Sequence, residues 1–397
     1  MTIYHNFKKY IKVCYKTFSA LIYLGYTSMI PKNKNLWVFG AWKGRNYSDN
    51  AKELFEYVSE NQKDIRAVWI AKNQIVYDQV KAKGYNVVMY PSKEAKKIVT
   101  RAGVNIQTES NEDTGRYRVS GTIIVQLFHG YGGVKEPRLY AGMSELKKKI
   151  VKIYADDHSK SYWMVPSVYF CGLLPNIYET DKNKMSITGQ PRIDLLLRRA
   201  KIEYFEDFIK THEIEKMLLY VPTHRNYGQN EGIDISYEEW QRLNNYLAAK
   251  KYYLLFKPHP LELYKYENFK GFSNIIIVTQ IPNSSDVYEY IHYFDALISD
   301  YSSIATDYLV LDRPIIHYMY DLDTFSTESM FVDDDNKFIC GPICKTQDDL
   351  IAALEDCFVN DRYRVKRVEV RSRAYKYIDS HNCERVYQRT QELLNEH

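Results

Sequence analysis

The sequence predicts an α/β protein made of two Rossmann-like units with a cleft between them. Its 397 residues, 45% of them hydrophobic, suffice to bury two cores rather than one. After Pro31, short β-rich apolar runs alternate with helical stretches, a pattern typical of parallel sheets flanked by helices. The alternation forms two series, and turn residues at 189–192 separate them.

The elements follow from the apolar runs and from the amphipathic stretches between them. In the first series we expect strands at 36–39, 67–70, 86–90 and 123–128 and a helix over 49–60. In the second we expect strands at 217–221, 253–256, 275–278, 296–298 and 315–318, and helices over 237–250, 286–293 and 303–311. The expected domains are therefore 32–188 and 189–397, with a basic terminal helical region over 362–373.

Residues 1–31 form a separate segment that is basic and rich in aromatic residues. Its uncharged stretch, Thr17 to Ile30, is shorter than the roughly 20 residues that span a bilayer, and no cleavage site of small residues follows it. We expect an amphipathic helix lying on the cytoplasmic face of the cell membrane, as in a peripheral membrane protein. The alternative is a helix that docks on the protein's own surface.

Charge and cysteine content narrow the class of partner. The 54 basic and 50 acidic residues leave a net charge of +4, which argues against nucleic acid as a partner. The six cysteines are scattered and have no metal-ligand spacing, as expected for reduced thiols in a cytosolic setting.

Polar turns that contain histidine follow three of the apolar runs. They are Phe128-His129-Gly130 with Lys135 further on, Val221-Pro222-Thr223-His224-Arg225, and Phe256-Lys257-Pro258-His259-Pro260. Ligands collect beyond the carboxyl ends of parallel strands, so these turns are candidate site residues. In a fourth segment, 298–308, serines precede a predicted helix. A helix start with serine hydroxyls is suited to phosphate, and the alternative is an ordinary N-cap.

Together these segments resemble the CDP-glycerol glycerophosphotransferase family, which includes teichoic acid primases and polymerases and enzymes of capsule synthesis. The similarity covers about 36–350. Its most specific part is Ser-Asp-Tyr-Ser-Ser at 299–303, followed by Asp-Tyr at 307–308 and Asp-Arg-Pro-Ile-Ile at 312–316. Weaker matches lie at 47–50, 189–194, 222–225 and 259–260. The chain departs from the family at 131–133, where Tyr-Gly-Gly replaces Thr-Pro-Leu. The resemblance places this loop on the acceptor side of the cleft, so the change concerns the acceptor more than the donor.

The resemblance implies a GT-B-like fold and a reaction in which an acceptor hydroxyl attacks the β-phosphorus of CDP-glycerol and releases CMP. The implied acceptor is a polyprenyl-diphosphate-linked saccharide or a growing surface polymer. His129 is the expected base, because imidazole titrates near neutral pH. Arg225, His259, Ser302 and Ser303 are expected around the diphosphate, where phosphoryl transfer needs hydrogen-bond donors and positive charge. We expect no metal and no cofactor.

The remaining candidates have alternative roles. Asp300 and Asp307 either hold the loop or bind substrate hydroxyls. Asp49 either binds substrate or, with Asn50, caps a helix. Further candidates for substrate binding are Gly130 and Lys135 of the 129–135 loop, Thr223, and Arg192. Arg192 lies at the boundary between the domains, where it either senses closure or pairs with a carboxylate. Four lysines within 145–152 either touch anionic headgroups or form a solvated helix face.

Three other functions fit parts of the pattern. A CDP-ribitol transferase would use the same diphosphate site, and a GT-B glycosyltransferase with a nucleotide sugar donor would share the fold. A non-catalytic protein that binds surface polymer would be expected to lack His129, Arg225 or His259, and all three are present. The short chain favours a primase or a capsule enzyme over a polymerase.

Overall fold

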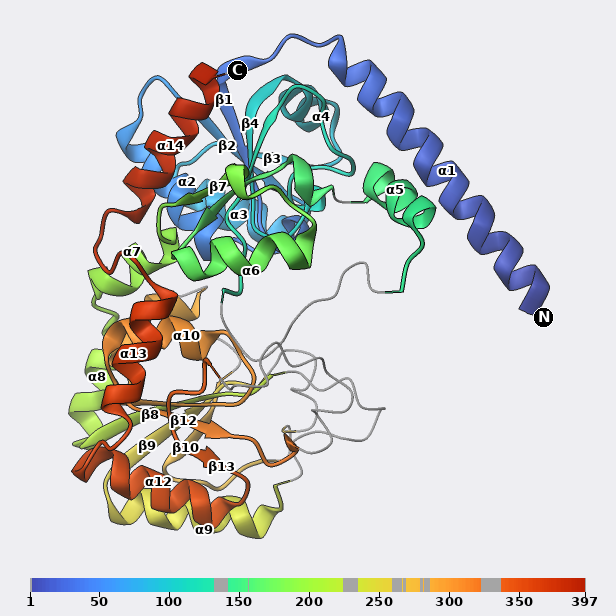
Figure 1. Ribbon diagram of the computed structural model, residues 1–397. Coiled ribbons are helices and arrows are strands. Elements are labelled where there is room, and N and C mark those ends of the chain that lie inside the picture. The colour runs from blue at the N-terminus through green and yellow to red at the C-terminus, as the bar shows by residue number, and fades with distance from the viewer. Residues whose placement is uncertain are drawn as a thin grey trace. The chain divides into compact units, whose positions relative to one another are not determined.

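We describe a computed structural model of the chain. It describes residues 2–131, 142–155, 157–223, 235–258, 266, 269–278, 281, 286–322 and 337–396. These residues divide into two compact units (Figure 1). The first unit contains 2–129, 142–194 and 379–396, and the second contains the other described residues.

The first unit is built on a parallel sheet. Its described strands, in spatial order, are β3 (Val87–Met89), β2 (Arg66–Ala71), β1 (Asn33–Phe39), β4 (Ala102–Gln107), β5 (Ile123–Gln126), β6 (Tyr162–Val165) and β7 (Met185–Ile187). The order reverses direction between β1 and β4, which is where a doubly wound sheet binds its ligands.

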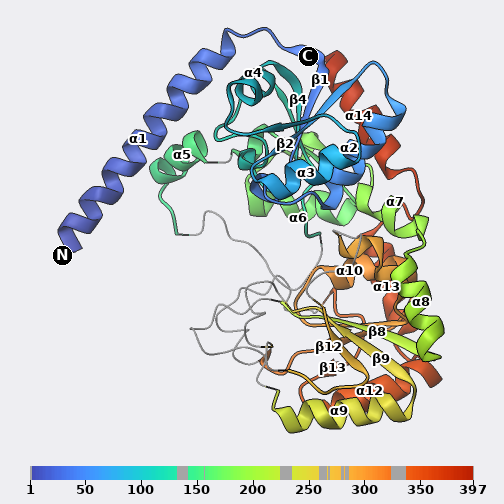
Figure 2. The ribbon, with the colours of Figure 1, turned by 180° about the vertical axis from the view of Figure 1, so that it is seen from behind.

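Helices cover both faces of this sheet, so alternate residues of each strand enter different cores. Trp37 and Phe39 of β1 pack with α2 (Asp49–Asn61), α3 (Gln74–Ala82) and α14 (Asn382–Glu396). Leu36 and Val38 of the same strand pack with α4 (Lys93–Arg101) on the other face. The remaining helices of the unit are α1 (Thr2–Ser28), α5 (Glu145–Tyr154), α6 (Val168–Tyr178), the start of α7 (Pro191–Arg198), and the short 3-10 helices η1 (Trp42–Gly44), η2 (Asn111–Asp113), η3 (His158–Lys160) and η4 (Lys182–Lys184). Figures 1 and 2 both show α1 beside α5.

The second unit has its own parallel sheet. Its described strands, in spatial order, are β10 (Ile275–Ile277), β9 (Tyr252–Phe256), β8 (Lys216–Val221), β11 (Ala296–Ser299), β12 (Ile315–Tyr318) and β13 (Ile343–Cys344). The helices are α8 (Glu203–His212), α9 (Tyr237–Ala249), α10 (Ile304–Tyr308), α12 (Gln347–Val359) and α13 (Arg364–Ala374), with the 3-10 helices η6 (Val287–Glu289), η7 (Ile291–Tyr293) and η8 (Leu309–Leu311). Helices α9 and α12 cover a core that includes Trp240 and Phe256. The order reverses between β8 and β11, so this sheet also has a switch point.

The structure corrects the sequence-based description in three places. The strands β4, β6, β7 and β13 had not been expected. The helix expected over 286–293 consists of the two short 3-10 helices η6 and η7. The C-terminal residues 379–396, expected in the second domain, belong to the first unit, because α14 buries Val386 and Leu393 in its core.

Two expectations about the chain as a whole can be compared with the structure. All six cysteines are free thiols, and four of them are buried. Within the described residues, no helix is both long enough and apolar enough to cross a membrane.

Candidate active site

His129 lies three residues after β5, at the carboxyl edge of the first sheet. Its Nδ1 is 3.1 Å from the carbonyl oxygen of Thr108, which follows the neighbouring strand β4. A carbonyl oxygen only accepts hydrogen bonds, so the neutral imidazole carries its proton on Nδ1. The opposite nitrogen, Nε2, then has a free lone pair and can take a proton from a substrate.

Two aromatic rings fix the plane of the His129 imidazole. The ring of Trp42, in the loop after β1, has its centroid 4.7 Å from that of His129, and the ring of Phe128 has its centroid 4.8 Å away. Both residues have positive φ angles, +50° for Trp42 and +54° for Phe128. Non-glycine residues in this region are strained, and such strain is concentrated at functional sites.

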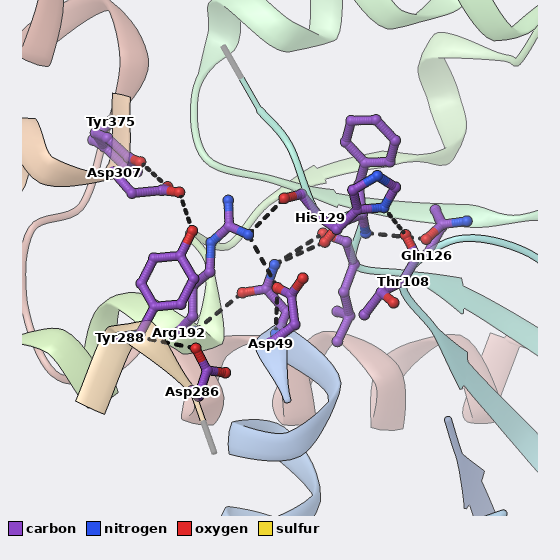
Figure 3. A network of polar contacts seen from close by, with 12 residues as sticks. Asp49, Thr108, Gln126, His129, Arg192, Asp286, Tyr288, Asp307 and Tyr375 are labelled. Carbon is purple, nitrogen blue, oxygen red and sulfur yellow. Dashed lines mark hydrogen bonds and ion pairs between the residues drawn. The ribbon is translucent and has the colours of Figure 1, made fainter. Parts of the chain in front are cut away.

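A buried polar clamp holds the turn that carries His129 (Figure 3). Asn50 at the start of α2 donates from Nδ2 to the carbonyl oxygen of Phe128 at 2.8 Å, and Arg192 donates from Nη1 to the carbonyl oxygen of His129 at 2.7 Å. The same Nη1 pairs with Asp49 Oδ1 at 3.0 Å, and the backbone N–H of Arg192 donates to Asn50 Oδ1 at 3.0 Å. Arg192 is 1% exposed and Asp49 5% exposed.

This burial bears on the roles expected for Asp49 and Arg192. Substrate binding was one expected role for each residue. In the structure, Asp49 Oδ1 accepts hydrogen bonds from Arg192 and from the backbone N–H of Asn50, and Arg192 also donates to the carbonyl oxygen of His129. Pairing with a carboxylate, the alternative foreseen for Arg192, is therefore present. Asp49 does not cap α2 either. The N-cap residue is Ser48, whose side chain makes no cap hydrogen bond. The geometry is that of a support for His129.

Asp113 organises the loop on the other side of His129. Its Oδ2 accepts the backbone N–H groups of Thr108 and Glu109, both at 2.8 Å, and its Oδ1 accepts the N–H of Lys43 at 2.6 Å. Burial raises the pKa of Asp113 to about 6. One carboxylate therefore ties the Thr108 segment to the Trp42–Lys43 turn, and these two segments supply the partners of the His129 ring.

In the second unit, Asp300 joins the ends of β8 and β11. Its carboxylate accepts the N–H of Thr223 at 2.9 Å, the Oγ1 hydroxyl of Thr223 at 2.6 Å and the N–H of Tyr301 at 2.6 Å. Asp300 is buried. Two roles were expected for Asp300, holding the loop and binding substrate hydroxyls. The contacts are those of a group that holds the loop.

Asp307 on α10 has a similar setting (Figure 3). It is fully buried, and the hydroxyls of Tyr288 and Tyr375 donate to its two carboxylate oxygens at 2.6 and 2.7 Å. Tyr375 follows α13, so the carboxylate connects distant parts of the second unit. These contacts too are those of a supporting residue.

Ser302 and Ser303 differ from the two aspartates because both are half-buried. Ser303 occupies the N-cap position of α10 but makes no side-chain cap bond. Gly130, which groups with the second unit, leaves room for it, since a Cβ on Gly130 would lie 3.2 Å from Ser303 Oγ. Ser302 Oγ accepts the backbone N–H of Ile304 at 3.4 Å, and the hydroxyls of both serines can still donate to a ligand.

Three expected site residues, Lys135, Arg225 and His259, lie outside the described residues. Among the residues that are described, no group of three or more His, Cys, Asp or Glu side chains could hold a metal ion. The expectation of a metal-free reaction stays a prediction.

Sequence reasoning did not find Thr108, Trp42, Tyr288 or Tyr375. Thr108 had a detectable signal, because it is the first residue after an apolar run that was not identified as a strand. The others give no signal in the sequence, since their roles depend on contacts with residues distant in the chain.

The sequence is similar to those of proteins with known functions. Residues 22–392 match the family described as CDP-Glycerol:Poly(glycerophosphate) glycerophosphotransferase. The teichoic acid glycerol-phosphate transferase of Staphylococcus aureus is 29% identical over 364 residues, covering 86% of this chain and 87% of that protein. The teichoic acid ribitol-phosphate polymerase TarK of the same organism is 27% identical over 69% of this chain and 53% of its own length.

Solved structures show the same fold. A variant of the wall teichoic acid polymerase TagF, soaked with CDPG, superposes with a TM-score of 0.74 at 20% identity, covering 97% of this chain and 98% of that one. This likeness confirms the GT-B-like α/β fold that the sequence resemblance implied. Since the family match extends over most of the sequence, the chain belongs to the CDP-glycerol:poly(glycerophosphate) glycerophosphotransferase family.

Proposed function

We propose that this protein, a glycerophosphotransferase by family, transfers glycerol phosphate from CDP-glycerol to a membrane-linked acceptor of teichoic acid or capsule synthesis and releases CMP. The observation that carries the proposal is the hydrogen bond from His129 to Thr108, which leaves a basic nitrogen free at the carboxyl edge of the first sheet. A transferase of this family needs such a base to activate the acceptor hydroxyl.

In the proposed step, the acceptor hydroxyl gives its proton to His129 Nε2 as its oxygen bonds to the β-phosphorus. The bond from that phosphorus to the bridging oxygen breaks, and CMP leaves with the oxygen. Negative charge accumulates on the phosphoryl oxygens and on the leaving group, where donors stabilise it. We assign this role to Ser302 and Ser303, with Arg225 and His259 as further candidates.

The buried residues act indirectly in this scheme. Asp49 and Arg192 hold the carbonyl oxygen of His129 in place, so they are positioning residues. Asp300 and Asp307 hold the two serines by fixing the start and the interior of the segment that carries them. Removing a positioning residue should lower kcat more than it raises the KM for CDP-glycerol.

CMP release by the purified full chain tests the function. The donors are CDP-glycerol, CDP-ribitol and common nucleotide sugars, the acceptor is a lipid-linked saccharide, and the variant is His129→Ala. The matched control is His212→Ala, since His212 is an exposed histidine on α8. We expect CMP from CDP-glycerol, loss of at least about 100-fold in His129→Ala, and no loss in the control.

Two results would change the proposal. Turnover with CDP-ribitol in place of CDP-glycerol would change the transferred group to ribitol phosphate, the unit named in the relative TarK. Turnover only with a nucleotide sugar would contradict the proposed reaction.

The membrane part of the proposal concerns the surface of α1. Ala20 and Thr27 are fully buried, and Lys16 lies over the ring of Tyr154 in α5, so one face of α1 docks on the first unit. On the opposite face, large apolar side chains recur every three or four residues and are exposed: Ile11, Tyr15, Phe18, Ile22, Tyr26 and Met29. One face of α1 therefore fits the docking alternative, and the exposed apolar face supports the membrane contact that we propose.

Only two of the four lysines of α5 are exposed and free of an ion pair with Glu179, so only these two are candidates for contact with anionic headgroups. Lys148 and Lys152 each pair with Glu179 at 2.9 Å, whereas Lys147 and Lys149 are exposed. We propose that the apolar face of α1, with Lys147 and Lys149, lies on the cytoplasmic face of the cell membrane, which would bring the enzyme to its lipid-linked acceptor.

Cosedimentation with vesicles that contain anionic lipid tests the membrane proposal. The double variant Phe18→Glu, Ile22→Glu should lose most of its binding, because both side chains would enter the apolar layer. The control is Val359→Glu, Val365→Glu, at positions that are 80% and 82% exposed in the second unit. Equal binding by both variants and the unmodified protein would exclude α1 as the contact.

A further inference from the structure

A cavity of about 540 Å³ opens at the carboxyl edge of the first sheet. Its walls come from the loops after four neighbouring strands: Lys43 and Arg45 follow β1, Lys72 follows β2, Tyr90 follows β3, and Arg116 follows β4. The switch point of the sheet, between β1 and β4, therefore lies at its base. The volume is in the range of small-molecule sites.

The cavity has an excess of positive charge. Lys43 is paired with Glu109 at 2.8 Å, and Lys72 donates to the carbonyl oxygen of Gly115 at 2.7 Å while lying over the ring of Tyr90. Within the described part of the chain, the guanidinium groups of Arg45 and Arg116 have no carboxylate partner. Glu112 is the acidic residue of the lining, and its contact with Lys72 is made through its backbone carbonyl oxygen.

The start of α3 adds to this potential. Asn73, part of the lining, caps the helix by accepting the N–H of Val76 at 2.9 Å, and it donates to the carbonyl oxygen of Arg45 at 2.9 Å. The first turn of α3 contains no acidic residue. The amino-terminal end of the helix dipole thus faces the cavity uncompensated and favours an anion there.

The cavity is coupled to the proposed base through the turn at 42–45. Trp42, whose ring contacts His129, is the residue before Lys43 of the cavity wall. Asp113 holds the N–H of Lys43 and that of Thr108, the partner of His129. The cation-lined wall and the imidazole therefore belong to one rigid arrangement.

We propose that this cavity binds a phosphate group of the acceptor, so that the acceptor hydroxyl is presented to His129. The inference rests on the proposed function and extends it by assigning a second anion site, separate from the donor diphosphate. The guanidinium of Arg116 lies over the ring of Tyr117, 5.1 Å from its centroid, which leaves its N–H groups at the edge to donate. Two guanidiniums without a carboxylate partner among the described residues suit a phosphate, whose oxygens accept paired hydrogen bonds. The phosphate comes either from the diphosphate of a lipid-linked saccharide or from a glycerol phosphate unit already transferred.

The test uses the double variant Arg45→Ala, Arg116→Ala in the full chain. Its conservative form is Arg45→Lys, Arg116→Lys, and its control is Arg66→Ala, an exposed arginine at the opposite end of strand β2. The initial rate of CMP release is measured against acceptor concentration and, separately, against CDP-glycerol. We expect the acceptor KM to rise about tenfold to hundredfold in the alanine form, less in the lysine form and not in the control.

The donor KM distinguishes the site from the donor site. It should stay within about twofold of the unmodified value in all variants. A rise in the donor KM with no change in the acceptor KM would assign the cavity to the donor and overturn the proposal. An unchanged acceptor KM in the alanine form would overturn it too.

Direct binding separates this proposal from the proposed function. Inorganic pyrophosphate and sn-glycerol 3-phosphate are titrated calorimetrically into the unmodified chain and the alanine form. We expect the unmodified chain and Arg66→Ala to bind, and the alanine form to lose this binding. Tighter binding of pyrophosphate would indicate the diphosphate of a lipid-linked saccharide as the source, and tighter binding of sn-glycerol 3-phosphate would indicate a glycerol phosphate unit. Failure of the chain to release CMP from any CDP-polyol would contradict the proposed function and leave this result standing, whereas equal binding by the alanine form would contradict the cavity assignment.

Discussion

The buried pair of Asp49 and Arg192 provides a quantitative test of the clamp on His129. Replacing Asp49 by Asn keeps the shape of the side chain and leaves the Arg192 guanidinium, 1% exposed, without its counter-charge at 3.0 Å. Breaking one side of a buried ion pair costs about 3–5 kcal/mol. We expect the free energy of unfolding of the first unit to fall by that amount and kcat to fall with it.

Urea unfolding followed by tryptophan fluorescence measures this free energy, because four of the five tryptophans are in the first unit: Trp37, Trp42, Trp69 and Trp163. Arg192→Met and the double variant complete a cycle, in which the coupling between the two residues should be at least about 2 kcal/mol. The control is Glu396→Gln, which removes an exposed partner of Arg389 and should cost no more than about 1 kcal/mol. A loss below about 1 kcal/mol for Asp49→Asn, or additive single variants, would refute the reasoning.

Three further predictions concern pH, the cavity wall and the C-terminal helix. Burial lowers the pKa of His317 to about 4 from its ordinary value near 6.5, so the unfolded chain takes up the proton first and stability falls as pH drops from about 6.5 towards 4. His317→Gln should remove about 2 kcal/mol of this loss, as measured by urea unfolding at pH 7 and pH 4.5, and an unchanged pH dependence would contradict it. Gly44→Ala should destabilise the first unit by about 1–3 kcal/mol, since Gly44 has a φ of +75° and its Cβ would lie 2.6 Å from Lys72 Cγ. Gly84→Ala, at φ +80° with nothing within 4 Å, should cost less, and equal losses would assign the effect to the backbone alone. Deletion of 379–397 should abolish the cooperative fluorescence transition of the first unit, because α14 supplies part of its core, and a retained transition would contradict this role.

The sequence predicted those strands that consist of uninterrupted apolar residues. Residues 36–39 and 123–125 are examples, since both lie in strands buried on two faces. β4 was missed for a physical reason: it follows α4 without a turn, and it contains Gly103 and a buried Asn105 within the apolar run. The short strand β7, three half-buried residues, has too little pattern to detect.

Part of the candidate site, like part of the fold, could be predicted from the sequence. The position of His129 at a strand end was evident from the sequence, because a polar turn follows an apolar run. The partners of His129 were not evident. Thr108 contacts the imidazole through a backbone carbonyl oxygen, and Arg192, which binds the carbonyl oxygen of His129, lies 63 residues away in the sequence. For Asp300 and Asp307 the sequence left two roles open, and the supporting role that we propose rests on burial and on specific donors that only the structure shows.

Backbone strain connects the clamp, the base and the cavity. Trp42, Lys43, Asp49 and Phe128 all have φ between +50° and +69°, a region that costs non-glycine residues about 1 kcal/mol or more each. Two of these segments are held by partly buried hydrogen bonds: the backbone N–H of Lys43 donates to Asp113, and Asn50 of the clamp donates to the carbonyl oxygen of Phe128. A flexible loop would relax this strain, so the bonds must keep the His129 imidazole and the cavity wall at a fixed separation. A fixed separation is what a transferase needs if one part of the acceptor is bound while its hydroxyl is oriented for attack, because orientation of that kind lowers the entropic part of the barrier.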